Sequence, residues 1–235
     1  MSVIPEQLQG IRRRLHLACE RAGRDPASVR LVAVSKTFPA SDILEAVSSG
    51  QSCFGESKLQ EAEPKIAELP AGLEWHFIGR VQRNKVRKIL PLFRSIHAVD
   101  SMKLAVYMDG IAAELGLFPE IFFQVDQAGE ETKGGFSPAE LQAAMPTLAG
   151  LSNLRMAGLM SIPPAAVDPE DSRRWFRLLR QFRDDLCGEF PVDLPFLSMG
   201  MSGDFEVAVE EGATHVRVGS LIFGKREYKV EGELG

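Results

Sequence analysis

Lys36 is the residue whose type and position most directly suggest chemistry. It follows Leu31-Val-Ala-Val34 and Ser35, an apolar run in which a lysine is costly unless its amine has a task or a partner. Burial or a neighbouring cation lowers the pKa of such an amine and makes it a nucleophile toward aldehydes. By position alone, however, the simpler interpretation is a lysine whose stem covers apolar groups while its amine reaches water.

Two loops of small residues follow other apolar runs. One is Gly200-Met-Ser202-Gly203-Asp204, which leads into a predicted helix, and the other is Gly219-Ser220. Free N–H groups at a helix start, the Ser202 hydroxyl and the close backbone approach that Gly203 allows all favour a bound phosphate. The alternative is that these glycines only make tight turns, and either loop alone leaves that alternative open.

Arg217 lies inside the apolar run from His215 to Val218. A buried guanidinium needs hydrogen-bond acceptors, because a polar group without them is costly to bury. The acceptors belong either to a structural carboxylate or to a bound ligand, and the sequence leaves both possibilities open.

A repeating pattern of strands and helices has to position these residues. An amphipathic helix is predicted over 4–22, and eight short, largely apolar segments read as strands with helical stretches between most of them. Buried strands that alternate with helices are typical of parallel βαβ units. The predicted strands are 29–35, 52–55, 74–79, 95–99, 120–126, 154–160, 195–200 and 214–219.

Eight such units close into a (β/α)8 TIM barrel, whose usual length is roughly 250 residues. An open doubly wound sheet is the rival, but it usually has fewer strands. Ligands of a barrel bind where the strands end, and phosphates commonly bind after strands seven and eight. Lys36 ends strand one, and the two small-residue loops follow strands seven and eight. A lysine, a phosphate cup and Arg217 around one barrel mouth suggest pyridoxal 5′-phosphate (PLP) as the cofactor.

Composition limits the other possibilities. The chain has 235 residues, 45% hydrophobic and 25% charged, with a net charge of −5. We expect a single domain over 1–235 with its core at about 29–226, and we expect neither nucleic acid nor membrane as a partner. Cys19, Cys53 and Cys187 are odd in number and widely spaced, which disfavours a disulfide framework or a zinc site and favours a reducing cytoplasm. Residues 1–9 lack a signal-peptide hydrophobic region, and no run is long enough to span a membrane.

Several conspicuous residues have plain structural interpretations. The basic run Arg80–Lys88 is most simply a solvated helix face, although a role in meeting an anionic cofactor or partner stays open. His76 is predicted to be a hydrogen-bonded core residue rather than a general base. His16, His97 and His215 show no metal-ligand spacing. Met199 is expected to pack in the barrel and to touch the cofactor ring.

Motifs along nearly the whole chain resemble the YggS/PROSC family of pyridoxal phosphate homeostasis proteins. Together they are highly specific, although each alone is not. The matching stretches are Val-Ala-Val-Ser-Lys-Thr at 32–37, Phe-Gly-Glu at 54–56, Trp-His-Phe-Ile-Gly at 75–79 with Gln82, Asn84 and Lys85, Gly-Leu-Met-Ser at 158–161, Leu-Ser-Met-Gly-Met-Ser at 197–202 and Val-Arg-Val-Gly-Ser-Leu-Ile-Phe-Gly-Lys-Arg at 216–226.

The resemblance implies a barrel of the alanine-racemase N-terminal-domain type that holds PLP as an internal aldimine on Lys36. It implies phosphate contacts from Ser202, Gly219 and Ser220, with Gly203 lining the loop, and it places Arg217 against the pyridine nitrogen. One position departs from the family pattern. Ser57 stands where the family usually has asparagine after Phe-Gly-Glu, and its shorter side chain puts a contact near the cofactor in doubt.

Two functions compete, a carrier or regulator of PLP and a PLP-dependent amino-acid racemase. The carrier is favoured, because an arginine opposite the ring nitrogen weakens the electron sink that catalysis needs. Racemases of this class also use a tyrosine from a second domain, and this sequence leaves no room for one; its tyrosines are Tyr107 and Tyr228. The carrier interpretation implies PLP-dependent apoenzymes as recipients and favours a monomer. A scaffold for another phosphorylated ligand is the third alternative.

Overall fold

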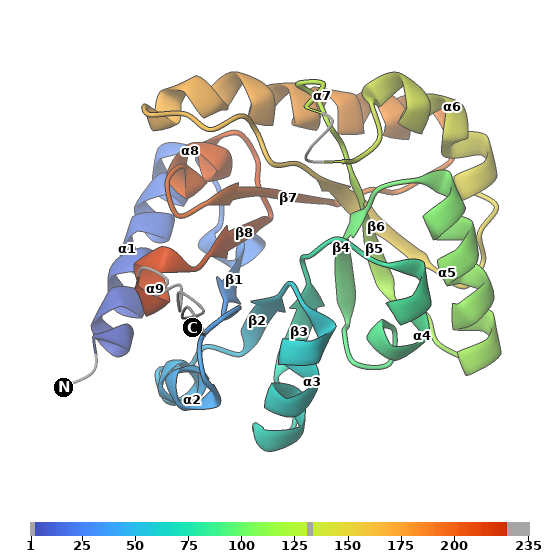
Figure 1. Ribbon diagram of the computed structural model, residues 1–235. Helices are drawn as coiled ribbons and strands as arrows, with labels where there is room; N and C mark the ends of the chain where they lie inside the picture. Colours follow the sequence, from blue (N-terminus) through green and yellow to red (C-terminus); the bar gives the residue numbers. More distant parts are fainter. Residues whose placement is uncertain (1–2, 131–133, 225–235) are drawn as a thin grey trace, which may run out of the picture.

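The computed structural model describes residues 3–130 and 134–224. Its eight strands run parallel and close into a barrel in which each strand pairs with the next and β1 pairs with β8 (Figure 1). This confirms the predicted (β/α)8 barrel and all eight predicted strands, with ends that shift by one or two residues. The strands are β1 Arg30–Val34, β2 Cys53–Glu56, β3 Glu74–Phe77, β4 Ser95–Val99, β5 Glu120–Gln124, β6 Arg155–Met160, β7 Phe196–Met201 and β8 His215–Val218.

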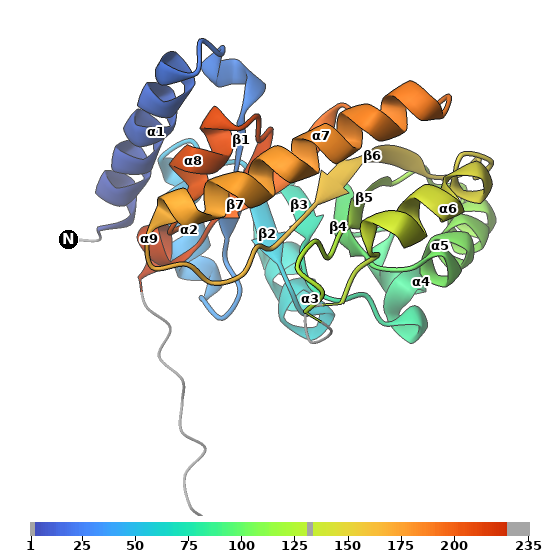
Figure 2. The ribbon, with the colours of Figure 1, turned by 90° about the horizontal axis from the view of Figure 1, so that it is seen from above.

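Helices surround the barrel and cover the outer face of its strands (Figure 1). Short 3-10 turns at Pro26–Ser28, Arg83–Lys85 and Pro169–Ser172 precede β1, α4 and α7. Figure 2 shows α7 crossing over β6 and β7. The helices are α1 Ile4–Arg21, α2 Ala40–Ser48, α3 Leu59–Glu68, α4 Val86–Ile89, α5 Met102–Leu115, α6 Pro138–Leu148, α7 Arg173–Glu189, α8 Phe205–Glu210 and α9 Ser220–Phe223.

The extra N-terminal helix α1 lies against the part of the barrel that holds both phosphate-loop candidates. Its apolar stripe, which includes Leu8, Ile11 and Leu15, is buried, as the spacing of these residues predicts. Two ion pairs with α8 fix its position, Arg14 to Glu206 and Arg21 to Glu210, each with a closest N–O distance of 2.7 Å. The helix therefore supports the segment that follows β7.

Local sequence signals explain where the helices begin. The Ser137 side chain accepts a hydrogen bond from the Glu140 backbone, and the Glu140 side chain accepts one from the Ser137 backbone, so α6 begins with the predicted capping box.

The basic run Arg80–Lys88 differs from the prediction that it lies on one helix. It forms a loop, a 3-10 turn and the single turn of α4, and most of its cations are exposed.

The strands bury two different layers. Their outward residues join the helices in one large apolar core, which includes Met199 and Val218. Their inward residues mix apolar with polar groups, among them Phe122, His97 and Arg217. In the described part of the chain, none of the helices is both long enough and apolar enough to cross a bilayer.

Candidate functional site

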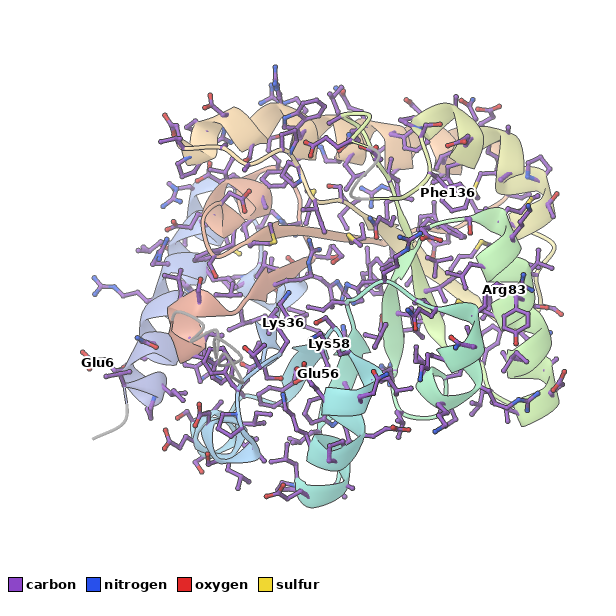
Figure 3. All side chains as sticks on the ribbon, in the orientation of Figure 1. Glu6, Lys36, Glu56, Lys58, Arg83 and Phe136 are labelled. Carbon is purple, nitrogen blue, oxygen red and sulfur yellow. The ribbon has the colours of Figure 1, made fainter. Side chains whose placement is uncertain are left out.

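Lys36 lies at the mouth of the barrel, two residues beyond the end of β1, and its side chain is partly buried. Figure 3 labels it together with Glu56 and Lys58, which come from the carboxyl end of the neighbouring strand β2. The next residue, Thr37, has φ of 72°, a conformation that is rare for a β-branched residue. The Thr37 backbone N–H donates to Glu61 of α3 over 3.1 Å, which helps to hold this turn.

Both small-residue loops meet beside the end of β1. The Gly219 N–H donates to the Ser202 Oγ over 3.3 Å, which joins the loop after β7 to the loop after β8. A Cβ at Gly219 would lie 3.1 Å from the carbonyl oxygen of Val34, so the Gly219 backbone packs closely on the end of β1. No described residue accepts a hydrogen bond from the N–H groups of Gly203 or Ser220. The pair of loops therefore has the donors that a phosphate needs.

Arg217 points into the barrel, where neutral acceptors hold its guanidinium. Its Nη1 donates to the Ser198 carbonyl oxygen (2.8 Å) and the Ser198 Oγ (2.6 Å), and its Nη2 donates to the Ser161 carbonyl oxygen (3.0 Å). Burial lowers the pKa of Arg217 to about 10, so the group stays charged at neutral pH. The sequence left two kinds of acceptor open, a structural carboxylate and a bound ligand. Among the described residues no carboxylate forms an ion pair with Arg217.

The buried carboxylate of Glu56 belongs to the Phe-Gly-Glu motif, but no role is predicted for it from the sequence. Glu56 Oε1 accepts from the Ser35 Oγ (2.7 Å) and the Lys65 Nζ (2.8 Å), and Lys65 also donates to the Ser35 carbonyl oxygen (2.9 Å). Burial raises the pKa of Glu56, and Glu56 Oε2 has no partner in residues 3–130 and 134–224. These bonds tie β2 and α3 to the residue before Lys36. An acidic residue that ends a buried strand was the available signal.

Two predicted site residues lie elsewhere. Met199 is fully buried in the core between strands and helices, on the face of β7 opposite to Ser198. Alternation along a strand sends the two side chains to opposite faces, so the expectation that Met199 touches the cofactor ring is wrong. Ser57 lies at the mouth one strand away from Lys36. It lines a separate cavity of about 190 Å³ together with Lys58, Arg80 and Lys85.

Three histidines fill the interior below Arg217. His76 and His97 are fully buried and His215 nearly so, and their ring centroids lie 4.9 to 5.9 Å apart. Burial holds the pKa of His97 well below its usual value and lowers that of His215 to about 3. His76 is a hydrogen-bonded core residue, as predicted, because its Nε2 lies 2.7 Å from Glu74 Oε1.

Glu74 lies at the opposite end of the barrel and is expected to make stability pH-dependent. The hydrogen bond to His76 is the largest cause that lowers its pKa to about 2. A lowered carboxyl pKa stabilises the fold above the unfolded value of 4.5, and that contribution disappears as pH falls toward 2. Its size is on the order of 2 kcal/mol, because about 1.4 kcal/mol per pKa unit is reduced by solvent screening.

Denaturant unfolding between these pH values measures the effect. Glu74→Gln should flatten the acid limb of the stability curve relative to the unaltered protein, because the amide does not titrate. An equally steep acid limb in this variant would contradict the assignment to Glu74.

Comparisons with known proteins agree with the fold and with the motifs. The family model for the alanine racemase N-terminal domain matches residues 7–227. A pyridoxal phosphate homeostasis protein of Aquifex aeolicus is 44% identical over 224 residues, 95% of this chain and 98% of that protein. Its Escherichia coli K12 counterpart is 39% identical over 237 residues, 97% of this chain and 99% of that protein.

Solved structures give the same picture. PipY of Synechococcus elongatus with PLP bound is 43% identical, with a TM-score of 0.81 over 91% of this chain and all of that one. A Clostridium difficile alanine racemase at 15% identity (TM-score 0.69, 93% of this chain and 60% of that one) shares the fold alone. The chain therefore belongs to the alanine racemase N-terminal domain family and, within it, to the pyridoxal phosphate homeostasis proteins.

Proposed function

We propose that this protein binds PLP reversibly through Lys36 and takes part in control of the cellular PLP supply. The observation that supports the proposal is that the end of β1, two residues before Lys36, packs against Gly219, whose loop is joined to Ser202. When bound, the cofactor supplies an aldehyde that condenses with an amine to a C=N bond, with loss of water.

The residues at the mouth fit the parts of this cofactor. The Ser202 hydroxyl and the backbone of Gly203, Gly219 and Ser220 would bind its phosphate, because small residues leave room and N–H groups remain to donate. Arg217 would face the ring nitrogen, with its orientation set by Ser198 and Ser161. Ser57 would add at most a peripheral contact from the neighbouring strand end.

Two features favour a carrier over a catalyst. Arg217 stays protonated at neutral pH, and a cation beside the ring nitrogen opposes ring protonation, which weakens the electron sink of PLP catalysis. The second feature concerns the tyrosines. Tyr107 lies on α5, and the guanidinium carbon of Arg83 lies 4.5 Å from the centroid of its ring. Tyr107 lines a groove on the outside of the barrel and not the mouth. Tyr228 lies outside the described residues. The relatives of this chain are also named for PLP homeostasis and not for turnover.

The proposal extends to partners and location. PLP-dependent apoenzymes are the recipients that a carrier requires, and a monomer suffices because one barrel contributes every proposed cofactor contact. Cys19, Cys53 and Cys187 are free thiols, which supports a reducing compartment such as the cytoplasm.

Covalent trapping tests the binding site. The protein is incubated with PLP, reduced with borohydride, digested and analysed by mass spectrometry, and the pyridoxyl group is expected on Lys36. Modification mainly of another lysine would refute the site.

Incubation with L- and D-alanine tests whether the protein is a carrier and not a catalyst. Racemisation at about 1 per second or faster, an ordinary enzymatic rate, would refute the carrier function.

A further inference from the structure

A continuous series of buried hydrogen bonds runs through the barrel from Arg217 to Glu74. Arg217 Nη1 lies 2.6 Å from Ser198 Oγ, and Ser198 Oγ lies 2.8 Å from His97 Nδ1. His97 Nε2 lies 2.8 Å from His76 Nδ1, and His76 Nε2 lies 2.7 Å from Glu74 Oε1. The series crosses the molecule from the mouth, where β6 and β7 end, to the opposite end, where β3 begins.

Its middle members are shielded from water. Ser198, His97 and His76 are each 0% exposed, whereas Glu74 is partly exposed and also contacts Arg30 and Arg94. Inside a protein an unsatisfied polar group is costly, so each donor in the series needs an acceptor. Two groups therefore determine the direction in which the hydrogens point: the carboxylate of Glu74, which only accepts, and the guanidinium of Arg217, which only donates.

The assignment proceeds from Glu74 upward while the imidazole rings are neutral. The carboxylate only accepts, so His76 carries its hydrogen on Nε2 and presents a lone pair at Nδ1. His97 must then donate from Nε2 and accept at Nδ1. Ser198 supplies its hydroxyl hydrogen to His97 Nδ1, and this leaves the Ser198 oxygen as an acceptor directed at Arg217.

We infer that Ser198, His97, His76 and Glu74 form a positioning relay that fixes the orientation of Arg217 from the far end of the barrel. The inference rests on the proposed function for its effect on PLP, because Arg217 is the group proposed to face the ring nitrogen. Without the relay, the Ser198 hydroxyl is free to turn its hydrogen toward the guanidinium, which costs Arg217 one of its three acceptors.

A metal site is the competing interpretation of the lower end. Cys53, Glu74 and His76 offer ligand atoms within 4.8 Å of one another. Two observations oppose a cation there. Arg30 and Arg94 already contact Glu74, and burial raises the pKa of the Cys53 thiol, which keeps it protonated and a poor ligand. The hydrogen-bonded relay accounts for Glu74 and His76 without a metal ion, and Cys53 stays a buried thiol beside it.

Imidazole NMR of the cofactor-free protein tests the relay itself. At about pH 8, above the ordinary imidazole pKa, long-range ¹H–¹⁵N spectra should show His76 and His97 protonated at Nε2 and not at Nδ1. Glu74→Ala leaves Arg217 as the only end group that sets the direction, so the share of the Nδ1–H form should rise, and it should rise most at His76, which loses its acceptor. Glu74→Gln should restore the Nε2–H form, because its amide oxygen also accepts.

Glu120→Ala is the matched control. Glu120 begins β5 on the same end of the barrel and pairs with Arg94 and Arg155, but no hydrogen bond links it to a histidine. This variant should leave both tautomers unchanged. Nδ1–H forms in the unaltered protein, or equal disturbance by Glu120→Ala and Glu74→Ala, would overturn the inference.

PLP affinity tests the consequence. Ser198→Ala removes one acceptor of a charged donor and should weaken PLP binding about tenfold. Glu74→Ala should weaken it by a smaller factor, and Glu120→Ala should not.

Unchanged affinity in a folded Ser198→Ala protein would overturn the inference while the proposed function stands. Should Ser198→Ala not fold, the Glu74→Ala and Glu74→Gln pair decides by itself. Failure of the unaltered protein to bind PLP would instead refute the proposed function, and the tautomers would still decide whether the relay exists.

Discussion

Lys36→Ala is expected to abolish the borohydride-stable pyridoxyl adduct and to weaken PLP binding by about a hundredfold or more, equivalent to about 3 kcal/mol. The methyl side chain cannot form the C=N bond, whereas the loops at Ser202 and Gly219 still bind the phosphate. Residual, non-covalent binding should therefore remain. Absorption spectra and equilibrium dialysis against PLP measure the two effects separately.

Lys58→Ala provides the matched control. Lys58 lies at the same mouth, but its side chain is 68% exposed and pairs with Glu61. Its replacement should leave the adduct and the affinity close to those of the unaltered protein. Full retention of a covalent adduct in Lys36→Ala would show that another amine binds the aldehyde. Equal loss in both variants would contradict a specific role of Lys36.

Gly158→Ala is expected to destabilise the fold by about 3 kcal/mol or more, the upper end of the cost of overpacking a core. Gly158 lies in β6 beside Phe196 of β7, and a Cβ there would lie 1.7 Å from the Phe196 carbonyl oxygen. The neighbour is backbone and not a flexible side chain, so β6 and β7 must separate to make room. Denaturant unfolding monitored by circular dichroism measures the loss.

Gly110→Ala makes the same chemical change where nothing obstructs it. Gly110 lies in α5 with open space around the position of an added Cβ. Alanine should stabilise the protein there by about 0.5–1 kcal/mol, because it favours helix over coil. Similar effects of the two substitutions would contradict the close approach of β6 and β7.

The fold can be predicted from the sequence because each strand is recognisable from the residues of its own short segment. Short, largely apolar runs between helical stretches mark all eight strands, and the number of strands implies closure into a barrel. The ends of those strands then place Lys36, Ser202 and Gly219 at one mouth without knowledge of any contact. Prediction succeeds here because the geometry of a closed barrel converts order along the chain into position in space.

Contacts inside the barrel depend on information that the sequence does not display. The partners of Arg217 follow from the pairing of β7 with β8, where the register shifts between Ser198 and Met201. Such an irregularity decides which side chain faces inward, so the series from Ser198 to Glu74 was not predicted. The bonds of Glu56 likewise join β2 to Ser35, the residue after β1, and to Lys65 of α3. Met199 was misplaced because its strand ends near the mouth while its side chain faces the helices.

Closure of the barrel between β1 and β8 has a consequence for the time at which the protein becomes competent. The amine belongs to the first strand–loop unit to leave the ribosome, but the pair that completes its surroundings, Ala33 beside Val218, forms only after almost the entire polypeptide has been translated. A growing chain thus carries Lys36 long before the loops proposed to bind the phosphate, at Ser202 and Gly219, have been made. At the proposed site, PLP can therefore bind with all of its proposed contacts only after β8 has been made and has paired with β1.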